Sequence, residues 1–147
     1  MYFNNSTRQM LANMGVGLRV DRTATALAAA TTPYFTITGV VQITGLYGIV
    51  TVASGANLCS WSATPTAGTA ASMCGDLDIN PALVGDLLGI TGVVATAMTY
   101  SGVAVGIMQP LIVTAGVINF IAAAADGTIS THLCYLPLTD DATVVVA

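Results

Sequence analysis

The clearest pattern of hydrophobic and polar positions lies between residues 116 and 137, where two apolar, β-prone runs flank Asp126-Gly127. Asp-Gly between such runs is a strong signal for a two-residue hairpin turn of type I′, whose two central residues need positive φ. A turn at this point would pair the runs with each other and place Ile121 opposite His132. The pattern therefore predicts an antiparallel hairpin that packs on a second sheet, because a lone hairpin is only marginally stable.

Both runs alternate with a period of two, so each has one face toward the core and one face away from it. The predicted core face carries Ile118, Phe120, Ala122, Ala124, Ile129, Thr131, Leu133 and Tyr135. The predicted outer face carries Asn119, Ile121, Ala123, Ala125, Thr128, Ser130, His132 and Cys134.

A second β region extends from Tyr34 to Ala53. Its first half alternates like a half-buried strand through Ile43, and Gly45 and Gly48 then indicate a turn or a bulge before the chain returns. Asp140-Asp141 indicates a further turn, and residues 54–75 are typical of a long loop with a strand or two inside it. Further strands are predicted at Val16–Val20, Ile90–Met98, Val103–Met108, Leu111–Thr114 and Ala142–Val146.

Helix signals are few. The best is Asp78–Gly89, in which Asn80 suits the N-cap, Pro81 the first helical position and Gly89 the residue past the end. Asn5 or Ser6 could cap another short helix near the N-terminus.

About eight short strands at regular spacing predict an all-β fold, either a β-sandwich or a barrel and jelly-roll-like in its leading version, with at most one or two short helices. The expected organisation is an N-terminal arm over residues 1–15 and a single β-sandwich domain over residues 16–147. We expect the arm to dock on a neighbouring subunit or partner through its aromatic and flexible apolar side chains. The candidate interface residues are Tyr2, Phe3, Met10, Leu11 and Met14.

Composition supports association. Charged residues make up 7% of the 147 residues, against ~25% in ordinary soluble domains, and the chain contains neither Lys nor Glu. The three cations, Arg8, Arg19 and Arg22, offer no basic patch for nucleic acid. Such an apolar chain has too little polar surface to cover itself, so we expect a homo-oligomer, a trimer or a dimer.

Charge-free runs also raise the question of a membrane span. The best window, Val103 to Ala125, is long enough to cross a bilayer, but Gln109-Pro110 and Asn119 interrupt it. The polar start of the chain gives no signal-peptide pattern. We therefore expect no membrane partner.

The candidates for chemistry are weak. His132 and Cys134 lie two residues apart on one strand face, but a zinc site needs about four ligands, and Cys59 and Cys74 are distant in sequence. Cys59 and Cys74 could form a disulfide, although the odd third cysteine favours buried free thiols. Neither a catalytic nor a metal site is predicted.

A calcium loop is the other possibility, because Asp76, Asp78 and Asn80 have its opening spacing. Pro81 stands where that loop needs glycine, and Leu87 where it needs a bidentate Glu. The chain also lacks a complete dinucleotide fingerprint and a phosphate-binding loop. We therefore expect no enzyme, no cofactor and no small-molecule substrate.

Two stretches carry a resemblance. The stretch from Gly116 to Ala147 resembles small structural proteins of tailed bacteriophages. The features that it shares with them are a glycine-led strand, a turn, an aromatic-Leu-Pro-Leu step, acidic turn residues and a final Ala/Val strand. Gly75 to Gly92 is similar to the middle of the same proteins. The resemblance implies a virion protein such as a head decoration, or cement, protein, assembled in the host cytoplasm and bound on the capsid surface to the major capsid protein.

Two functions remain open at this point. The first is a structural virion protein that stabilises a bacteriophage head by binding itself and the capsid. The alternative is a carbohydrate- or receptor-binding β-sandwich module of a phage tail or cell surface, with Trp61 and the tyrosines as the sugar platform. Exposed aromatic side chains on one loop face would favour the second.

Overall fold

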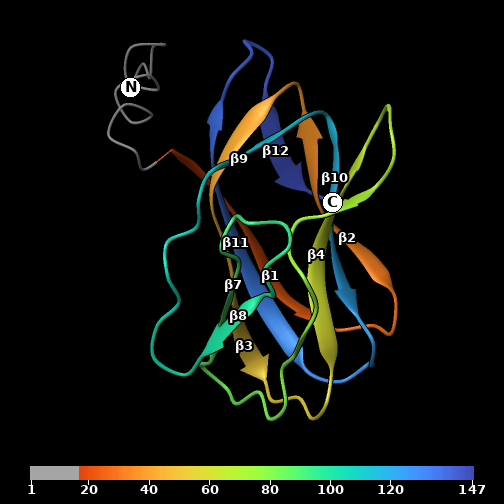
Figure 1. Cartoon of the computed structure of the whole chain (residues 1–147), viewed down its shortest axis with the longest axis vertical. Helices are drawn as coiled ribbons and strands as arrows, with labels where there is room; N and C mark the ends of the chain where they lie inside the picture. Colours follow the sequence, from red (N-terminus) through yellow and green to blue (C-terminus); the bar gives the residue numbers. More distant parts are fainter. Residues whose placement is uncertain (1–16) are drawn as a thin grey trace.

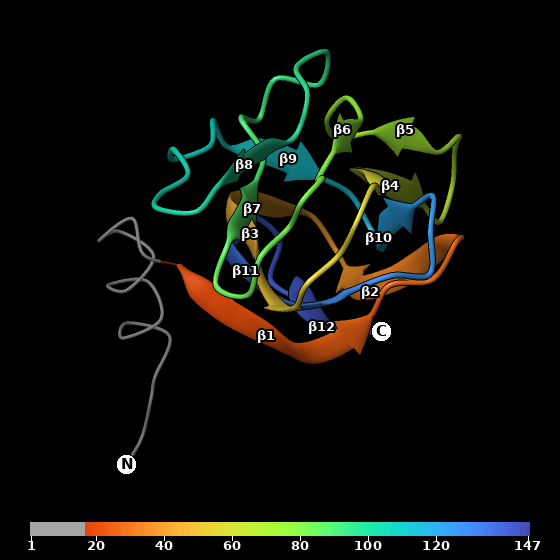
Figure 2. The same cartoon turned by 90° about the horizontal axis from the view of Figure 1, so that it is seen from below.

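The computed structural model describes residues 17–147, which form two six-stranded antiparallel sheets packed against each other. Figure 1 and Figure 2 show the two layers from perpendicular directions. The described residues contain no helix, so they form an all-β sandwich.

Each sheet combines strands from both halves of the chain. Sheet A has the order β1 (Leu18–Ala26), β11 (Thr128–Pro137), β3 (Val41–Val52), β7 (Leu87–Gly89) and β8 (Thr99–Ser101), and β9 (Leu111–Val113) also pairs with β3. Sheet B has the order β12 (Thr143–Val146), β2 (Thr31–Thr38), β10 (Gly116–Ala122), β4 (Leu58–Pro65) and β5 (Ala71–Ser72), and β6 (Leu77–Asp78) also pairs with β4.

Most connections between strands cross from one sheet to the other, although the two longest, residues 90–98 and 102–110, stay within sheet A. β1, β3, β7 and β11 belong to sheet A, whereas β2, β4, β10 and β12 belong to sheet B. The neighbour orders β1-β11-β3-β7 and β2-β10-β4-β5 are those of the double Greek key called a jelly roll. The predicted fold class is confirmed, in its sandwich form.

The core lies between the sheets and has an aromatic centre. The Trp61 ring packs edge-on against Phe120, with ring centroids 4.8 Å apart, and against Tyr34 at 5.5 Å. All three come from sheet B, and sheet A covers them with aliphatic side chains that include Ile43 and Leu133, both fully buried. Edge-to-face contacts of this kind stabilise a core beyond the area that they bury.

The predicted hairpin is wrong in its pairing, because β10 and β11 lie in different sheets. β10 pairs with β2 and β4, placing Phe120 beside Trp61, and β11 pairs with β1 and β3. Asp126-Gly127 joins the two layers, and only Gly127 has positive φ, so the turn is not type I′. A turn signal is local, whereas each strand finds its partners across the whole chain.

The predicted faces are nevertheless correct. Ile118, Phe120, Leu133 and Tyr135 are all at least 96% buried, and the outer-face residues of β11 are half-buried. Alternation depends only on the strand itself, so it survives a change of pairing partner. On β10 the outer-face residue Asn119 is also buried, and its side-chain amide donates to the Thr64 hydroxyl at 3.0 Å.

The predicted helix at Asp78–Gly89 is also wrong. This segment contains the last residue of β6, a bridge between Ala82 and Ser54, a turn and β7. The Asp86 carboxylate closes the turn by accepting a hydrogen bond from the Leu83 amide at 2.8 Å. A helix of two turns has little stability of its own, so pairing with neighbouring strands decides the conformation.

Three other strand predictions change. The predicted strand from Tyr34 to Ile43 is divided at Gly39, whose φ is 68°, so that β2 and β3 enter opposite sheets. β3 then continues through Gly45 and Gly48 with a pairing irregularity at Thr44, which is the bulge rather than the turn. The segments predicted as strands at 90–98 and 103–108 are loops, apart from bridge pairing at Ala97.

Gly127 offers a test of the turn between the sheets. Its φ of 90° strains any residue with a side chain, and an added Cβ would lie 2.7 Å from the Ser54 Cβ. Gly127→Val should lower the free energy of unfolding by at least about 1 kcal/mol, measured by urea denaturation. The matched control is Gly106→Val, where an added Cβ meets open space; equal losses in the two variants would contradict the argument.

Candidate functional site

The predicted interface residues Tyr2, Phe3, Met10, Leu11 and Met14 lie outside the described residues. Their role stays a prediction. The predicted arm over residues 1–15 lies outside them as well.

His132 belongs to a small polar cluster on the outer face of sheet A. Its Nδ1 lies 2.6 Å from Asp21 Oδ1, and its ring stacks on Tyr47 with centroids 4.8 Å apart. The other carboxylate oxygen of Asp21 accepts a hydrogen bond from Arg19 at 2.7 Å. Sequence reasoning missed Asp21 because the pairing of β1 with β11 joins residues that are far apart in the chain.

This cluster holds the His132 imidazole by a hydrogen bond to Asp21 but does not complete a Cys-His site. Cys134 is two residues along the same strand, ~7 Å away, which is beyond hydrogen-bond reach. Burial raises the pKa of the Cys134 thiol. Hydrogen bonds from His132 first, and then from Arg19, lower the pKa of the Asp21 carboxyl.

Both described arginines are engaged within the chain. Arg19 pairs with Asp21, and the Arg22 guanidinium donates to the backbone carbonyls of Tyr34 at 3.2 Å and Ala147 at 2.9 Å. Arg22 also lies 4.5 Å above the Tyr34 ring, so it joins the β1 edge of sheet A to sheet B.

Cys59 and Cys74 are free, buried thiols, as the sequence favoured. Burial raises the pKa of Cys59 to about 12, and it raises that of Cys74, whose Sγ accepts a hydrogen bond from the Trp61 amide at 3.3 Å. Among residues 17–147, no three His, Cys, Asp or Glu side chains come together in a group that could hold a metal ion.

Most of the described aromatic side chains lie inside the sandwich, whereas Tyr47 stacks on His132 at the outer face of sheet A. Trp61 and Tyr34 are completely or almost completely buried, and Tyr135 is 4% exposed. Tyr100 is half-buried, and its hydroxyl donates to the Asp86 carboxylate. The expectation that Trp61 and the tyrosines form a sugar platform is therefore wrong for Trp61, Tyr34 and Tyr135.

The most unusual surface belongs to an apolar segment, residues 90–110, which consists of two loops on either side of β8 and which we call the apolar loop. Val103 is 90% exposed and Ile107 is 98% exposed, and Val93 and Val94 are also exposed. The whole stretch from 87 to 125 has no charged residue. Large exposed apolar side chains without neighbouring charges are typical of an interaction surface.

The apolar loop is anchored at both ends and in its middle. Ile90, Met98 and Met108 insert into the core, each at least 95% buried. The Gln109 amide donates to the Thr91 carbonyl at 2.8 Å, which closes the base of the loop. Val103 and Ile107 are therefore held outward by a fixed framework.

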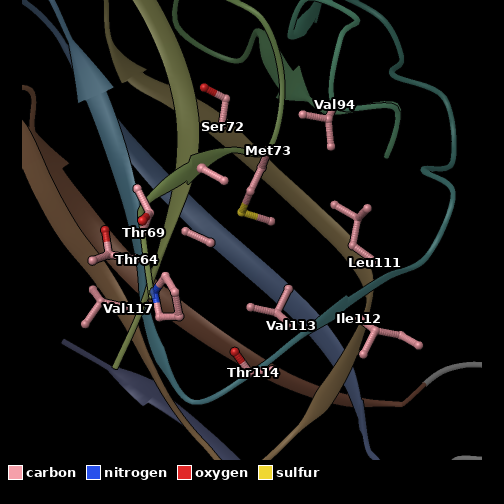
Figure 3. Close-up of a pocket in the computed structure, with 13 residues that line it drawn as sticks. Thr64, Thr69, Ser72, Met73, Val94, Leu111, Ile112, Val113, Thr114 and Val117 are labelled. Atoms are coloured by element: carbon pink, nitrogen blue, oxygen red, sulfur yellow. The ribbon is translucent and has the colours of Figure 1, made fainter. Parts of the chain in front are cut away.

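A groove lies beside this loop, where an edge of sheet A faces an edge of sheet B (Figure 3). β9 supplies Leu111 and Val113, β4 and β5 supply the opposite wall, and Met73 contributes to the lining. The cavity is about 250 Å³. Its full lining is Ala63, Thr64, Pro65, Thr69, Ala71, Ser72, Met73, Val94, Leu111, Ile112, Val113, Thr114 and Val117.

The groove contains no chemistry for catalysis. Its lining consists of apolar side chains and Thr or Ser hydroxyls, without a charged group, a histidine or a cysteine. Its volume is also below the ~300–1,000 Å³ of most small-molecule pockets. The size and the chemistry suit one or two apolar side chains of a macromolecular partner.

Comparison with known proteins gives no relative: the chain matches no family model, no curated protein and no solved structure. The part of the chain from residue 17 onward has no helix long and apolar enough to cross a membrane. The apolar loop and the groove are thus identified by their physical character alone.

Acid should weaken the Asp21 pair. Because the folded state lowers the pKa of Asp21, its stabilising effect is complete above the unfolded value of ~3.9 and disappears as pH falls through the lower folded value. Urea denaturation should show Asp21→Asn less stable than the wild type at pH 5.5, with a smaller difference at pH 2.5. A difference that stays constant between these pH values would contradict the ion-pair assignment.

Thiol reactivity should separate the cysteines. At pH 8 a small thiol reagent should modify Cys134 in the native protein, because it is the one cysteine that is not fully buried. Cys59 and Cys74 should react only after denaturation. The control is Cys134→Ser, which should show no native-state reaction; rapid labelling of a thiol in that variant would contradict the burial of Cys59 and Cys74.

Proposed function

We propose that this protein is a structural virion protein, a decoration or cement protein that stabilises a bacteriophage head through self-association and contacts with the major capsid protein. The observation that carries the proposal is the exposed, charge-free apolar loop. The proposal places the protein on the capsid surface, in contact with other protein subunits.

The distribution of charge supports association through this part of the molecule. From residue 17 onward, the charged residues are two arginines near the start of β1 and aspartates at 21, 76, 78, 86, 126, 140 and 141. None lies between 87 and 125, where Val103 and Ile107 are exposed. Burying one such side chain at an interface contributes ~1.5–3 kcal/mol, so a few of them can hold a subunit in place.

The fold is compatible with the same proposal. Jelly rolls occur in viral capsid proteins and also in lectins, so the fold alone does not choose between a virion protein and a sugar-binding module. The burial of Trp61 removes the best candidate for a sugar platform. The resemblance of Gly116–Ala147 and Gly75–Gly92 to structural proteins of tailed bacteriophages favours the virion.

Sedimentation tests the proposal. The purified protein should form oligomers, and it should co-sediment with capsid shells. Ile107→Asp should weaken both interactions at least tenfold, because a carboxylate at the interface would lose its hydration, and it should leave the circular-dichroism spectrum of the folded protein unchanged. A wild-type protein that stays monomeric and does not bind shells would refute the assembly function.

The control is Val145→Asp. Val145 is exposed on β12, at the edge of sheet B opposite to β5, so the same change in charge occurs far from the groove. This variant should associate like the wild type. Equal weakening by both substitutions would point to a general effect of charge and would count against the apolar loop as the interface.

A further inference from the structure

We propose that the groove between β9 and β5 is the acceptor site for residues 1–16 of a second copy of this chain. The inference rests on the proposed self-association and names the surfaces that carry it. The donor is the segment that precedes Gly17, and the acceptor is the open side of the sandwich.

The acceptor has two unpaired edges. Among the strands of residues 17–147, β9 pairs only with β3 in sheet A and β5 pairs only with β4 in sheet B, so each has one edge without a neighbouring strand in that part of the chain. The groove lies between these edges, as Figure 3 shows for Val113, Leu111 and Ser72. An extended peptide can add to such an edge through its backbone and place alternate side chains in the adjoining pocket.

The groove accepts apolar groups. Leu111, Val113 and Val117 line it together with Met73, whose flexible thioether adapts to the shape of an incoming side chain. The volume of about 250 Å³ fits one or two side chains and not a whole domain. A peptide segment with spaced apolar residues is therefore a better occupant than a flat protein face.

Residues 1–16 have the matching composition. Their apolar side chains include Tyr2, Phe3, Met10 and Leu11, and Arg8 is the single charged residue. Polar Asn, Ser, Thr and Gln residues separate the two apolar groups, as expected for a peptide that is half in a groove and half in water. The uncharged groove imposes no electrostatic penalty on such a segment.

The segment starts from the far edge of sheet A. Three strand spacings, ~14 Å, separate β1 from β9. The paired residues that connect the two strands are Leu18–Tyr135, Tyr135–Ile43 and Ile43–Leu111. Sixteen extended residues reach ~50 Å, which is enough to enter the groove of an adjacent molecule. Figure 2 shows β1 and β9 on opposite sides of the layer that contains β11 and β3.

The surroundings of the groove favour a second copy over the chain's own segment. Val94 and Ile112 line the groove and remain exposed, and the apolar loop continues this uncharged surface. A segment folded back on its own groove would fill the cavity and leave that rim in water. A neighbouring copy brings both the segment and a body that covers the rim.

Photo-crosslinking tests the arrangement in the full-length chain. Phe3 is replaced by benzoylphenylalanine in nitrogen-15-labelled protein, which is mixed with unlabelled wild type, illuminated and digested. Mass spectrometry should find peptides that join labelled residues 1–16 to unlabelled residues 63–73 or 111–117. Cross-links confined to one copy, cross-links to another surface, or none would each overturn the proposal.

A groove-filling variant gives an independent readout. Thr69 is exposed and lines the groove, so Thr69→Trp should block the site, reduce the inter-copy cross-link at least tenfold and weaken self-association. The matched control, Thr143→Trp, changes an exposed threonine on β12 and should have no effect. Self-association that Thr69→Trp leaves unchanged would refute this inference alone, whereas a wild type that neither self-associates nor binds capsid shells would refute the proposed function as well.

Discussion

Packing between the two sheets is the interaction on which the rest of the structure depends. Each sheet buries one face against the other, and the centre of that contact is the edge-to-face arrangement of Trp61, Phe120 and Tyr34 under the aliphatic layer of sheet A. Neighbours in sequence such as β10 and β11 belong to opposite sheets, so neither sheet can be completed without the other. The strands at the edges, the apolar loop and the groove are all held in place by this one core.

The same core explains which properties the sequence could predict. Period-two alternation identified the buried faces of β10 and β11, because an apolar residue must face the core whichever strand lies beside it. Asp126-Gly127 lies in the connection that carries the chain from sheet B to sheet A, but its local conformation contains no information on the sheet that each strand enters. Pairing of Leu18 with Tyr135 is a property of the whole chain, and a hairpin rule that compares neighbouring runs cannot supply it.

The predicted helix is an error in the type of secondary structure, whereas the predicted hairpin was an error in strand pairing. Asn80, Pro81 and Gly89 are good local helix signals, yet Ile79 and Ala82 are fully buried and the Ala82 backbone pairs with Ser54. Long-range pairing outweighs weak local preferences when a segment has only two turns. Composition, in contrast, predicted exposed apolar side chains, but only the three-dimensional arrangement could place residues such as Val103 and Ile107 on the apolar loop.

The apolar loop combines buried anchoring residues with exposed apolar side chains. Its buried residues, Ile90, Met98 and Met108, are as apolar as its exposed ones, so a hydropathy profile cannot separate the two classes. Its closed base at Thr91 and Gln109 limits the conformational entropy that binding would remove. Because little conformational entropy is lost when such a surface binds, it favours a stable contact over a transient one.

The position of β11 has a consequence for the biogenesis of the protein. β11 lies between β1 and β3 in sheet A, and β10 lies between β2 and β4 in sheet B, so the central strand of each sheet is made late. At ~5–20 residues per second, a ribosome needs on the order of ten seconds to continue from β1 to β11. During that interval β1 and β3 lack their partner β11, and β2 and β4 lack their partner β10. Nascent chains on one polysome carry the same unpaired strands. Synthesis of many copies close together would thus favour contacts between chains before either sheet is complete.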